Sequence, residues 1–379
     1  MRVMVLAAAA VAIVCGGGRT QAAVVQTRHL EYVVTDGSVS VFDIDHAHRL
    51  VQTIPLPEAR GVRGVGASLR YQRLYVSFGG DGGGGSGSTG SLAAVDLRSG
   101  RVVWTRSYGT GIDSFAVTPD GRTIYLPTGE LSTGTDWLVI AADTGALRGK
   151  VSGGRGPHNT VVGLDGRLVW LGGRTDSYLV AVSTSSGRVV RRVGPLLEGV
   201  RPFTINGRQT LAYTTATGLL GFQLSDARTG RVLYTVRVPG YRYDPSTYRP
   251  SAPSHGISLA PDERRLYVID GPNSAVHVFD VSRGGARRPR LVASIRLRHP
   301  LTGNESPCAY DCARDGWLQT SRDGRYLYVG DSGDVIDTRT RRVVAFLAPL
   351  RETRKMLEID WRGTRVVGTT TRTGLGYVR

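Results

Sequence analysis

The stretch Phe115-Ala116-Val117-Thr118-Pro119-Asp120-Gly121-Arg122, continued by Thr123-Ile124-Tyr125-Leu126, shows the unit that decides the fold. An alternating apolar run ends at a polar Asp-Gly-Arg turn, and a second run of β-branched and aromatic residues follows. Asp-Gly dipeptides accept the positive backbone dihedrals of tight hairpin turns, and β-branched and aromatic residues suit a pleated, half-buried surface. The stretch therefore predicts two antiparallel strands joined by a short turn.

Turns of this kind recur along the chain, each followed by a short alternating run, and helical periodicity is absent. A second turn of the Thr-Gly-Arg kind separates further strands, as at Ser99-Gly100-Arg101 and Thr229-Gly230-Arg231. A repeat of about 40 to 60 residues with four short strands is typical of a β-propeller blade. The further copies of the first turn are Asp165-Gly166-Arg167, Asn206-Gly207-Arg208, Asp262-Glu263-Arg264 and Asp323-Gly324-Arg325.

Counting the strand before each Asp-Gly-Arg turn predicts an all-β, seven-bladed β-propeller with four antiparallel strands in each blade. Residues 29–56 supply outer strands without an inner one, and residues 355–361 supply an inner strand without a complete blade. Pairing them in one blade closes the ring and removes two open sheet edges. Residues 364–379 offer another strand pair that competes for this place. The seven inner strands are expected near Val65, Phe115, Val161, Phe203, Ile257, Leu318 and Leu357.

The chain resembles the YVTN-repeat, YncE-like β-propellers, whose repeat has an alternating strand, then Pro-Asp-Gly-Arg, then Tyr-Val. The matching stretches are residues 115–122 and 254–262, and the resemblance extends over nearly the whole chain after the N-terminal segment. Residues 156–160, 201–206 and 253–256 are similar to an exported bacterial subgroup without a settled activity. Related propeller families include lactonases, quinoprotein dehydrogenases and denitrification proteins. The resemblance implies the fold, whereas any activity carried over would be analogy.

The N-terminus has the three parts of a secretory signal peptide: Met1-Arg2, an apolar run over residues 3–14, and small residues that end at Ala22-Ala23. We therefore expect a signal peptide over residues 1–23 and a single propeller domain over residues 24–379. The protein would be exported, to the periplasm, the cell surface or the medium. Lipid attachment at Cys15 is not expected, because Val14 is larger than the residue that usually precedes a lipoprotein cysteine. The apolar run is too short to span a bilayer.

The other two cysteines lie close together at Cys308 and Cys312. In an oxidising compartment such a pair can form a disulfide that pins a loop, which is the interpretation favoured here. A thiolate metal site is the alternative, but a structural zinc site takes four ligands and only two sulfurs are present.

The chain of 379 residues carries a formal net charge of +17, which raises nucleic acid or another polyanion as a partner. Lys150 and Lys355 are its only lysines, and its arginines are scattered. This pattern favours a solvated surface shaped by coding bias. Binding of single-stranded nucleic acid or another polyanion stays open as an alternative.

Candidate site residues come from the start of each inner strand, because in a propeller these positions converge on one mouth of the central channel. Such a mouth suits a small anionic or polyhydroxylated ligand. The rival use of these side chains is to bond backbone groups at strand ends, and Asn159 also suits a turn. A metal held by His158, His255 and Asp113 is a further alternative. The candidates are Asp113, His158, Asn159, Arg201, His255, Asp315 and Lys355, with Glu358 on the last inner strand.

No Gly-x-Ser-x-Gly elbow, His-Glu-x-x-His helix or phosphate-binding Gly-rich loop is present in the sequence. The leading hypothesis is therefore an exported, monomeric binding or scaffold protein without a cofactor, whose partner is an unknown small molecule or protein. A lactonase-type hydrolase is the second hypothesis, with His158 or His255 as base and Arg201 or Lys355 holding an anion. Polyanion binding is the third.

Overall fold

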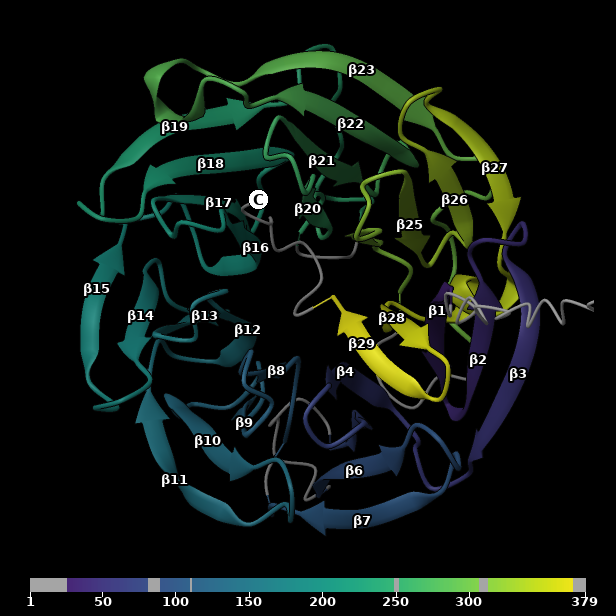
Figure 1. Ribbon diagram of the computed structural model, residues 1–379. Coiled ribbons are helices and arrows are strands. Elements are labelled where there is room, and N and C mark those ends of the chain that lie inside the picture. The colour runs from purple at the N-terminus through teal and green to yellow at the C-terminus, as the bar shows by residue number, and fades with distance from the viewer. Residues whose placement is uncertain (1–25, 81–88, 110, 249–251, 307–312, 371–379) are drawn as a thin grey trace, which may run out of the picture.

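The described residues of a computed structural model, 26–80, 89–109, 111–248, 252–306 and 313–370, form seven antiparallel sheets. The sheets follow one another around a ring, and their inner strands border its centre (Figure 1). This is the predicted seven-bladed β-propeller. The signal-peptide segment with Cys15, and the pair Cys308 and Cys312, lie outside the described residues. Among the described residues, no helix has the length and apolar character needed to span a bilayer.

Six of these sheets have four strands each. The first three are β4 (Val62–Ser68), β5 (Arg73–Gly79), β6 (Gly90–Asp96) and β7 (Val102–Ser107); β8 (Ala116–Val117), β9 (Thr123–Pro127), β10 (Asp136–Ala141) and β11 (Leu147–Ser152); and β12 (Pro157–Val162), β13 (Leu168–Gly173), β14 (Leu179–Ser183) and β15 (Val189–Val193). The next three are β16 (Val200–Ile205), β17 (Leu211–Ala216), β18 (Gly221–Asp226) and β19 (Val232–Arg237); β20 (Ile257–Leu259), β21 (Arg265–Asp270), β22 (Ala275–Asp280) and β23 (Arg290–Arg296); and β24 (Trp317–Thr320), β25 (Tyr326–Gly330), β26 (Asp334–Asp337) and β27 (Arg342–Phe346). Two short 3₁₀ helices are η1 (Gly284–Ala286) and η2 (Ala348–Glu352).

The closing blade differs from this pattern because it has five strands, in the order β29-β28-β1-β2-β3. Strand β1 near the N-terminus pairs with β28 near the C-terminus, from Thr27 opposite Arg362 to Val33 opposite Met356. Strand β29 pairs with the other edge of β28, so it does not compete with β1. The predicted four strands are present here as β28-β1-β2-β3, and β29 is added to them as a fifth. The bounds are β1 (Thr27–Thr35), β2 (Gly37–Asp43), β3 (Arg49–Leu56), β28 (Met356–Arg362) and β29 (Arg365–Thr369).

The Asp-Gly-Arg turns have the geometry that their residues predict. Asp120 Oδ1 accepts hydrogen bonds from the backbone N of Arg122 at 3.0 Å and from Thr118 Oγ1 at 2.6 Å. Gly121 has φ of +72°, and a Cβ atom there would lie 2.3 Å from Ser68 Oγ of the preceding blade. Only glycine therefore suits this turn, because it both needs a positive φ and lets two blades pack closely.

The core lies between neighbouring blades, where the inner and middle strands pack face to face. Trp137 and Trp170 are fully buried, whereas outer strands such as β7 and β11 are mostly exposed. Trp137 donates a hydrogen bond to Thr160 on the next blade, and Trp170 donates one to Gln209 on the blade after it. These contacts fix each blade against its neighbour, and so fix where each inner strand begins.

Candidate functional site at the channel mouth

Charged or imidazole side chains stand at or just before the start of all seven inner strands. Because the inner strands border the centre of the ring, residues far apart in sequence meet there (Figure 1). Six of the predicted residues belong to this group. We call the group, together with the loop residues that contact it, the mouth cluster. The seven positions are Arg63, Asp113, His158, Arg201, His255, Asp315 and Lys355.

One half of the mouth cluster is built around Glu130, in the loop between β9 and β10. Its carboxylate lies 2.7 Å from Arg174, 3.3 Å from Arg63 and 3.8 Å from Arg201. His158 Nδ1 lies 3.8 Å from the same carboxylate. Burial alone would raise the pKa of Glu130, but the charges of His158 and the arginines outweigh it and hold the pKa well below its usual range. Glu130 is therefore a fixed negative charge that gathers three guanidinium groups.

His158 is oriented by Asp113. Its Nδ1 lies 2.7 Å from Asp113 Oδ2, and because a carboxylate can only accept, Nδ1 carries the proton. Asp113 is also 3.9 Å from Arg63. Burial acts to raise the pKa of Asp113, but the charges of His158 and Arg63 lower it overall, so the carboxylate stays ionised. This arrangement turns the other ring nitrogen of His158, Nε2, away from Asp113.

Within the described part of the chain, three buried nitrogen atoms of the mouth cluster have no hydrogen-bond partner: His158 Nε2, Arg201 Nε and Arg201 Nη1. His158 is 5% exposed and Arg201 is 3% exposed. A buried polar atom without a partner costs on the order of 1–3 kcal/mol, more for a charged group, so folded proteins rarely leave several of them together. The Arg201 nitrogens can donate hydrogen bonds to a small ligand. His158 Nε2 can donate when it carries a proton and accept when it does not.

The other half of the mouth cluster is centred on Arg354, beside the predicted Lys355. Its guanidinium lies 2.6 Å from Asp315, 3.2 Å from Glu305 and 3.7 Å from Asp331. Burial raises the pKa of Asp315 to about 6 and that of Glu305 to about 8, in spite of Arg354. This half therefore holds carboxyl groups that can take up protons close to neutral pH.

His255 connects the two halves, with its ring centroid 6.4 Å from that of His158. Its Nδ1 donates to the carbonyl of Gly316 at 3.2 Å and lies 3.2 Å from Asp315 Oδ1. Burial, together with the charge of Arg354, holds the pKa of His255 well below its usual range, so the ring is neutral. Burial and the charge of Arg354 also lower the pKa of Lys355 to about 8, and its ammonium lies 5.7 Å from the centroid of a Trp317 ring.

The other two predicted residues lie within strands and not at the start of an inner strand. Asn159 is fully buried within β12, opposite Gly172. Glu358 is placed elsewhere, and the expectation that it lines the mouth is corrected. It lies three residues beyond Lys355 along β28, which at about 3.3 Å per residue moves it roughly 10 Å toward the turn end of the blade. There it contacts His29 and the backbone of Arg322.

Several residues of the mouth cluster were missed in the sequence. Arg63 stands two residues before Val65, so extending the alignment to the first blade would have found it. Arg354 is adjacent to a predicted residue but does not share its repeat position. The others occupy loops of unequal length, where no repeat position can be assigned; they are Glu130, Arg174, Glu305 and Asp331.

The metal set that the sequence suggested is not the one that the structure brings together. His255 bonds Gly316, and the residues whose ligand atoms lie within 4.8 Å of one another are Asp113, Glu130 and His158. The guanidinium groups around Glu130 already neutralise these carboxylates, and their charge disfavours a cation. The donor set of the mouth cluster fits an anion better than a metal.

The described residues line a cavity of about 20 Å³ beside the cluster, between Ser114, Trp317, Arg354 and Lys355, which has room for one water. A larger pocket of about 690 Å³ lies elsewhere, between the β16–β17 and β20–β21 turns. That pocket is wide open and holds none of the cluster residues. Unpaired buried donors are more direct evidence of ligand binding than an open groove, so the mouth cluster is the better candidate site.

Comparison with known proteins shows the fold alone. No protein-family model matches the chain, and no curated protein matches it. A solved structure, that of a functionally unknown protein from Desulfotomaculum acetoxidans DSM 771, is similar with a TM-score of 0.64 and 12% sequence identity. The match covers 86% of this chain and 98% of that one. The chain therefore has the architecture of that protein, whose own function is not known.

Proposed function

We propose that this β-propeller binds a small hydroxylated carboxylate at the channel mouth without transforming it. The observation that carries the proposal is that three buried nitrogens on His158 and Arg201 have no hydrogen-bond partner among the described residues. A carboxylate placed against Arg201 would accept from Nε and Nη1, and a hydroxyl of the same ligand would form a hydrogen bond with His158 Nε2. Surrounding groups supply the charge balance, since three arginines face two carboxylates in this half of the mouth cluster.

The wider setting of this proposal rests on the sequence. The repeated Asp-Gly-Arg turns support a place among the YVTN-repeat, YncE-like propellers, and residues 1–23 support export. An exported propeller with a built polar site and no recognised catalytic motif suits a binding or scaffold role. The positions where the seven inner strands begin lie close together in the ring, which explains how such a site arises from separate parts of the chain.

Thermal unfolding with matched ligands tests the proposal, because a ligand that binds the folded state raises the midpoint. The probes are gluconate and other small hydroxy acids, with sorbitol as the neutral control that keeps the hydroxyls but lacks the carboxylate. We expect gluconate or another hydroxy acid to raise Tm in a saturable way, and sorbitol to have little effect. The variant Arg201→Met should weaken binding at least about tenfold, the cost of losing roughly one charged hydrogen bond.

An exposed arginine provides the matched control. Among the described residues Arg228 forms an ion pair only with Asp226, at the surface, so Arg228→Met should leave ligand affinity unchanged. Equal affinity in the wild type and in Arg201→Met would overturn the proposal, as would the lack of any Tm response across the hydroxy acids. Binding that is confined to single-stranded nucleic acid and weakens steeply with salt would instead favour the polyanion alternative.

The pairing of Asp113 with His158 favours a hydrolase as the second candidate function. Asp113 holds the Nδ1 proton, which leaves Nε2 free to take a proton from water. The hydroxide equivalent would attack a lactone carbonyl, the ring C–O bond would break, and the proton would pass to the alkoxide oxygen. Turnover of a lactone panel that is abolished in His158→Gln would establish this function. Binding of a hydroxy acid without any turnover would support the first.

A further inference from the structure

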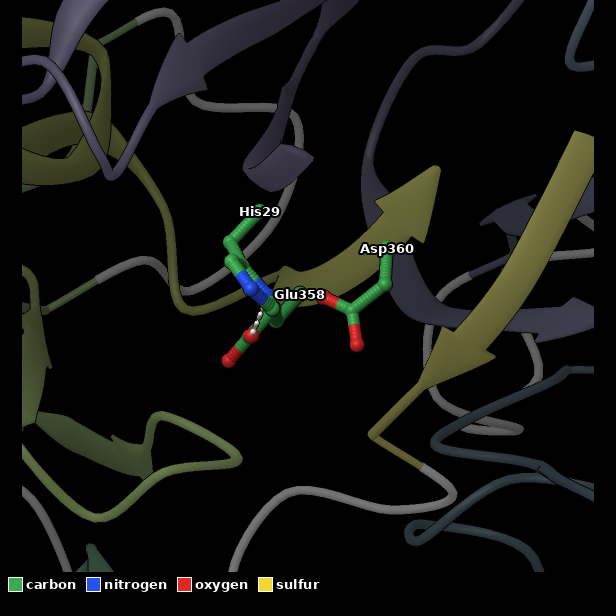
Figure 2. Close-up of side chains that lie close together, drawn as sticks. All are labelled: His29, Glu358 and Asp360. Carbon is green, nitrogen blue, oxygen red and sulfur yellow. Dashed lines mark hydrogen bonds and ion pairs between the residues drawn. The ribbon is translucent and has the colours of Figure 1, made fainter. Parts of the chain in front are cut away.

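A second cluster of ionisable side chains lies on the closing blade, away from the channel mouth. His29 on β1 stands opposite Asp360 on β28, and Glu31 stands opposite Glu358. Residues two apart on a strand face the same side of the sheet, so these four side chains form one patch between paired strands. Figure 2 shows three of them, His29, Glu358 and Asp360, which we call the closing-blade cluster.

The ligand atoms of the closing-blade cluster converge on one point. His29 Nδ1 lies 2.8 Å from Asp360 Oδ1 and 3.6 Å from Glu358 Oε1 (Figure 2). The other oxygens of both carboxylates are held by one residue, Arg322. Its backbone N donates to Glu358 Oε2 at 2.6 Å, and its guanidinium pairs with Asp360 Oδ2. Outer contacts of this kind orient the ligands of metal sites.

We propose that His29, Glu358 and Asp360 form a binding site for a divalent transition metal such as Zn²⁺. In a tetrahedral zinc site with bonds of about 2.0–2.1 Å, neighbouring ligand atoms are separated by roughly 3.3 Å. The separations of 2.8 and 3.6 Å from His29 Nδ1 lie on either side of this value. One imidazole and two carboxylates, with a fourth position left for water, is a donor set that zinc accepts and that magnesium, which prefers oxygen ligands, does not.

The surroundings of the closing-blade cluster supply both access and a need for positive charge. A pocket of about 310 Å³ is lined by His29 and Glu358, and the His29 side chain is 40% exposed. Asp45 and Asp323 line the same pocket and add negative charge, and Arg325 adds one positive charge to its wall. The pocket therefore gives an ion a route to the cluster and leaves space for water as a further ligand.

Glu31 is the independent sign that a cation suits this place. Its side chain is fully buried, and both of its oxygens accept from a single amide nitrogen of Gln319, at 3.0 and 3.2 Å. It also stands directly opposite Glu358 on the paired strand, where like charges are unfavourable. A metal ion on the Glu358 side of this pair would stabilise both carboxylates.

The mouth cluster offers a rival set, Asp113, Glu130 and His158, with similar separations of 2.7 and 3.8 Å from the His158 Nδ1 atom. Three arginines lie within 4.0 Å of that set, whereas the closing-blade cluster pairs only with Arg322 among the described residues. The lower density of fixed positive charge is the reason to assign the metal to the closing blade.

Titration calorimetry with Zn²⁺ on the tag-free full chain tests the assignment. We expect one saturable site, and His29→Gln should weaken it at least about tenfold, which is what loss of an outer partner alone costs in known sites. His29 is half-exposed at the start of a strand, so this variant should fold; far-UV circular dichroism checks that it does. Asp360→Asn is the second variant and should weaken binding similarly.

Two controls make the result specific. His46→Gln removes an exposed histidine 3.0 Å from Asp43 in the neighbouring turn and should leave Zn²⁺ affinity unchanged. His158→Gln should also leave it unchanged. Loss of Zn²⁺ binding in His158→Gln with none in His29→Gln would place the ion at the mouth and overturn the assignment, as would a wild-type chain that does not bind Zn²⁺. The visible spectrum of bound Co²⁺ should change in His29→Gln and not in His46→Gln.

Discussion

Lys355 has a pKa lowered to about 8, first by burial and then by the charge of Arg354, and it lies in the mouth cluster. Glu305 in the same group has a pKa raised to about 8 by burial. As pH rises through 8, Lys355 loses its positive charge and Glu305 gains a negative one, so both changes oppose an anion. We expect affinity for gluconate to fall about tenfold between pH 7 and pH 9, measured by calorimetry, since one pKa unit corresponds to about 1.4 kcal/mol.

The chain contains a matched control for this pH effect. Lys150 is the only other lysine and is exposed beside Asp136, so Lys150→Met should keep the full decline in affinity. Lys355→Met combined with Glu305→Gln should show nearly the same affinity at both pH values. A wild-type affinity that does not change between pH 7 and pH 9 would mean that neither group faces the ligand.

At the scale of the element, β29 depends on a side chain from the neighbouring blade. Gln72, in the turn between β4 and β5, accepts from the Val366 backbone N at 2.7 Å and donates to the Val366 carbonyl at 3.1 Å. Its φ of +53° favours asparagine among the possible replacements, and asparagine is one methylene too short to make both bonds. We expect Gln72→Asn to speed hydrogen exchange of the Val366 amide roughly tenfold, as two lost hydrogen bonds imply.

Gln209 occupies the turn between β16 and β17 with nearly the same backbone conformation as Gln72, so its substitution controls for the effect of changing a turn residue. Its φ is +54°, and its side chain bonds Trp170 and Asp165 rather than β29. Gln209→Asn should therefore loosen the β12–β15 blade and leave the Val366 amide as protected as in the wild type. Faster exchange at Val366 in both variants would show that β29 is protected by the general stability of the ring and not by the two hydrogen bonds from Gln72.

At the scale of the whole molecule, the repeat was enough to predict the ring but not its fifth closing strand. The Asp-Gly-Arg turns mark five inner strands by local chemistry, and the strands near Val65 and Leu357 complete the predicted count of seven. Strand β29 is equally plausible as a strand in sequence, and its place is decided by which edge of β28 remains free once β1 has paired. Pairing partners are a tertiary property that a local pattern does not contain.

The mouth cluster, too, could be predicted only in part from local sequence patterns. Residues such as His158 and His255 could be predicted to converge because they share one position in a repeat. Glu130 could not, because it belongs to a loop whose length differs between blades. Glu358 is a candidate in sequence because it lies on the last inner strand, whereas its position along that strand places it beside His29 and Arg322. Which Arg201 nitrogens lack a hydrogen-bond partner among the described residues depends on side-chain directions that the packed ring defines.

Ring closure depends on β1, which is the only strand among the described residues that joins β28 to β2. It buries Leu30, Tyr32, Val33 and Val34, each 4% exposed or less. At about 1.5–3 kcal/mol for each buried side chain, its removal costs roughly 6–12 kcal/mol, which equals the whole stability of a typical domain. We expect a chain that starts at Val25 to unfold cooperatively with the wild-type midpoint, and a chain that starts at Asp36 to show no native transition in a thermal scan. A native-like midpoint in the shorter chain would mean that the six remaining blades close without this pairing.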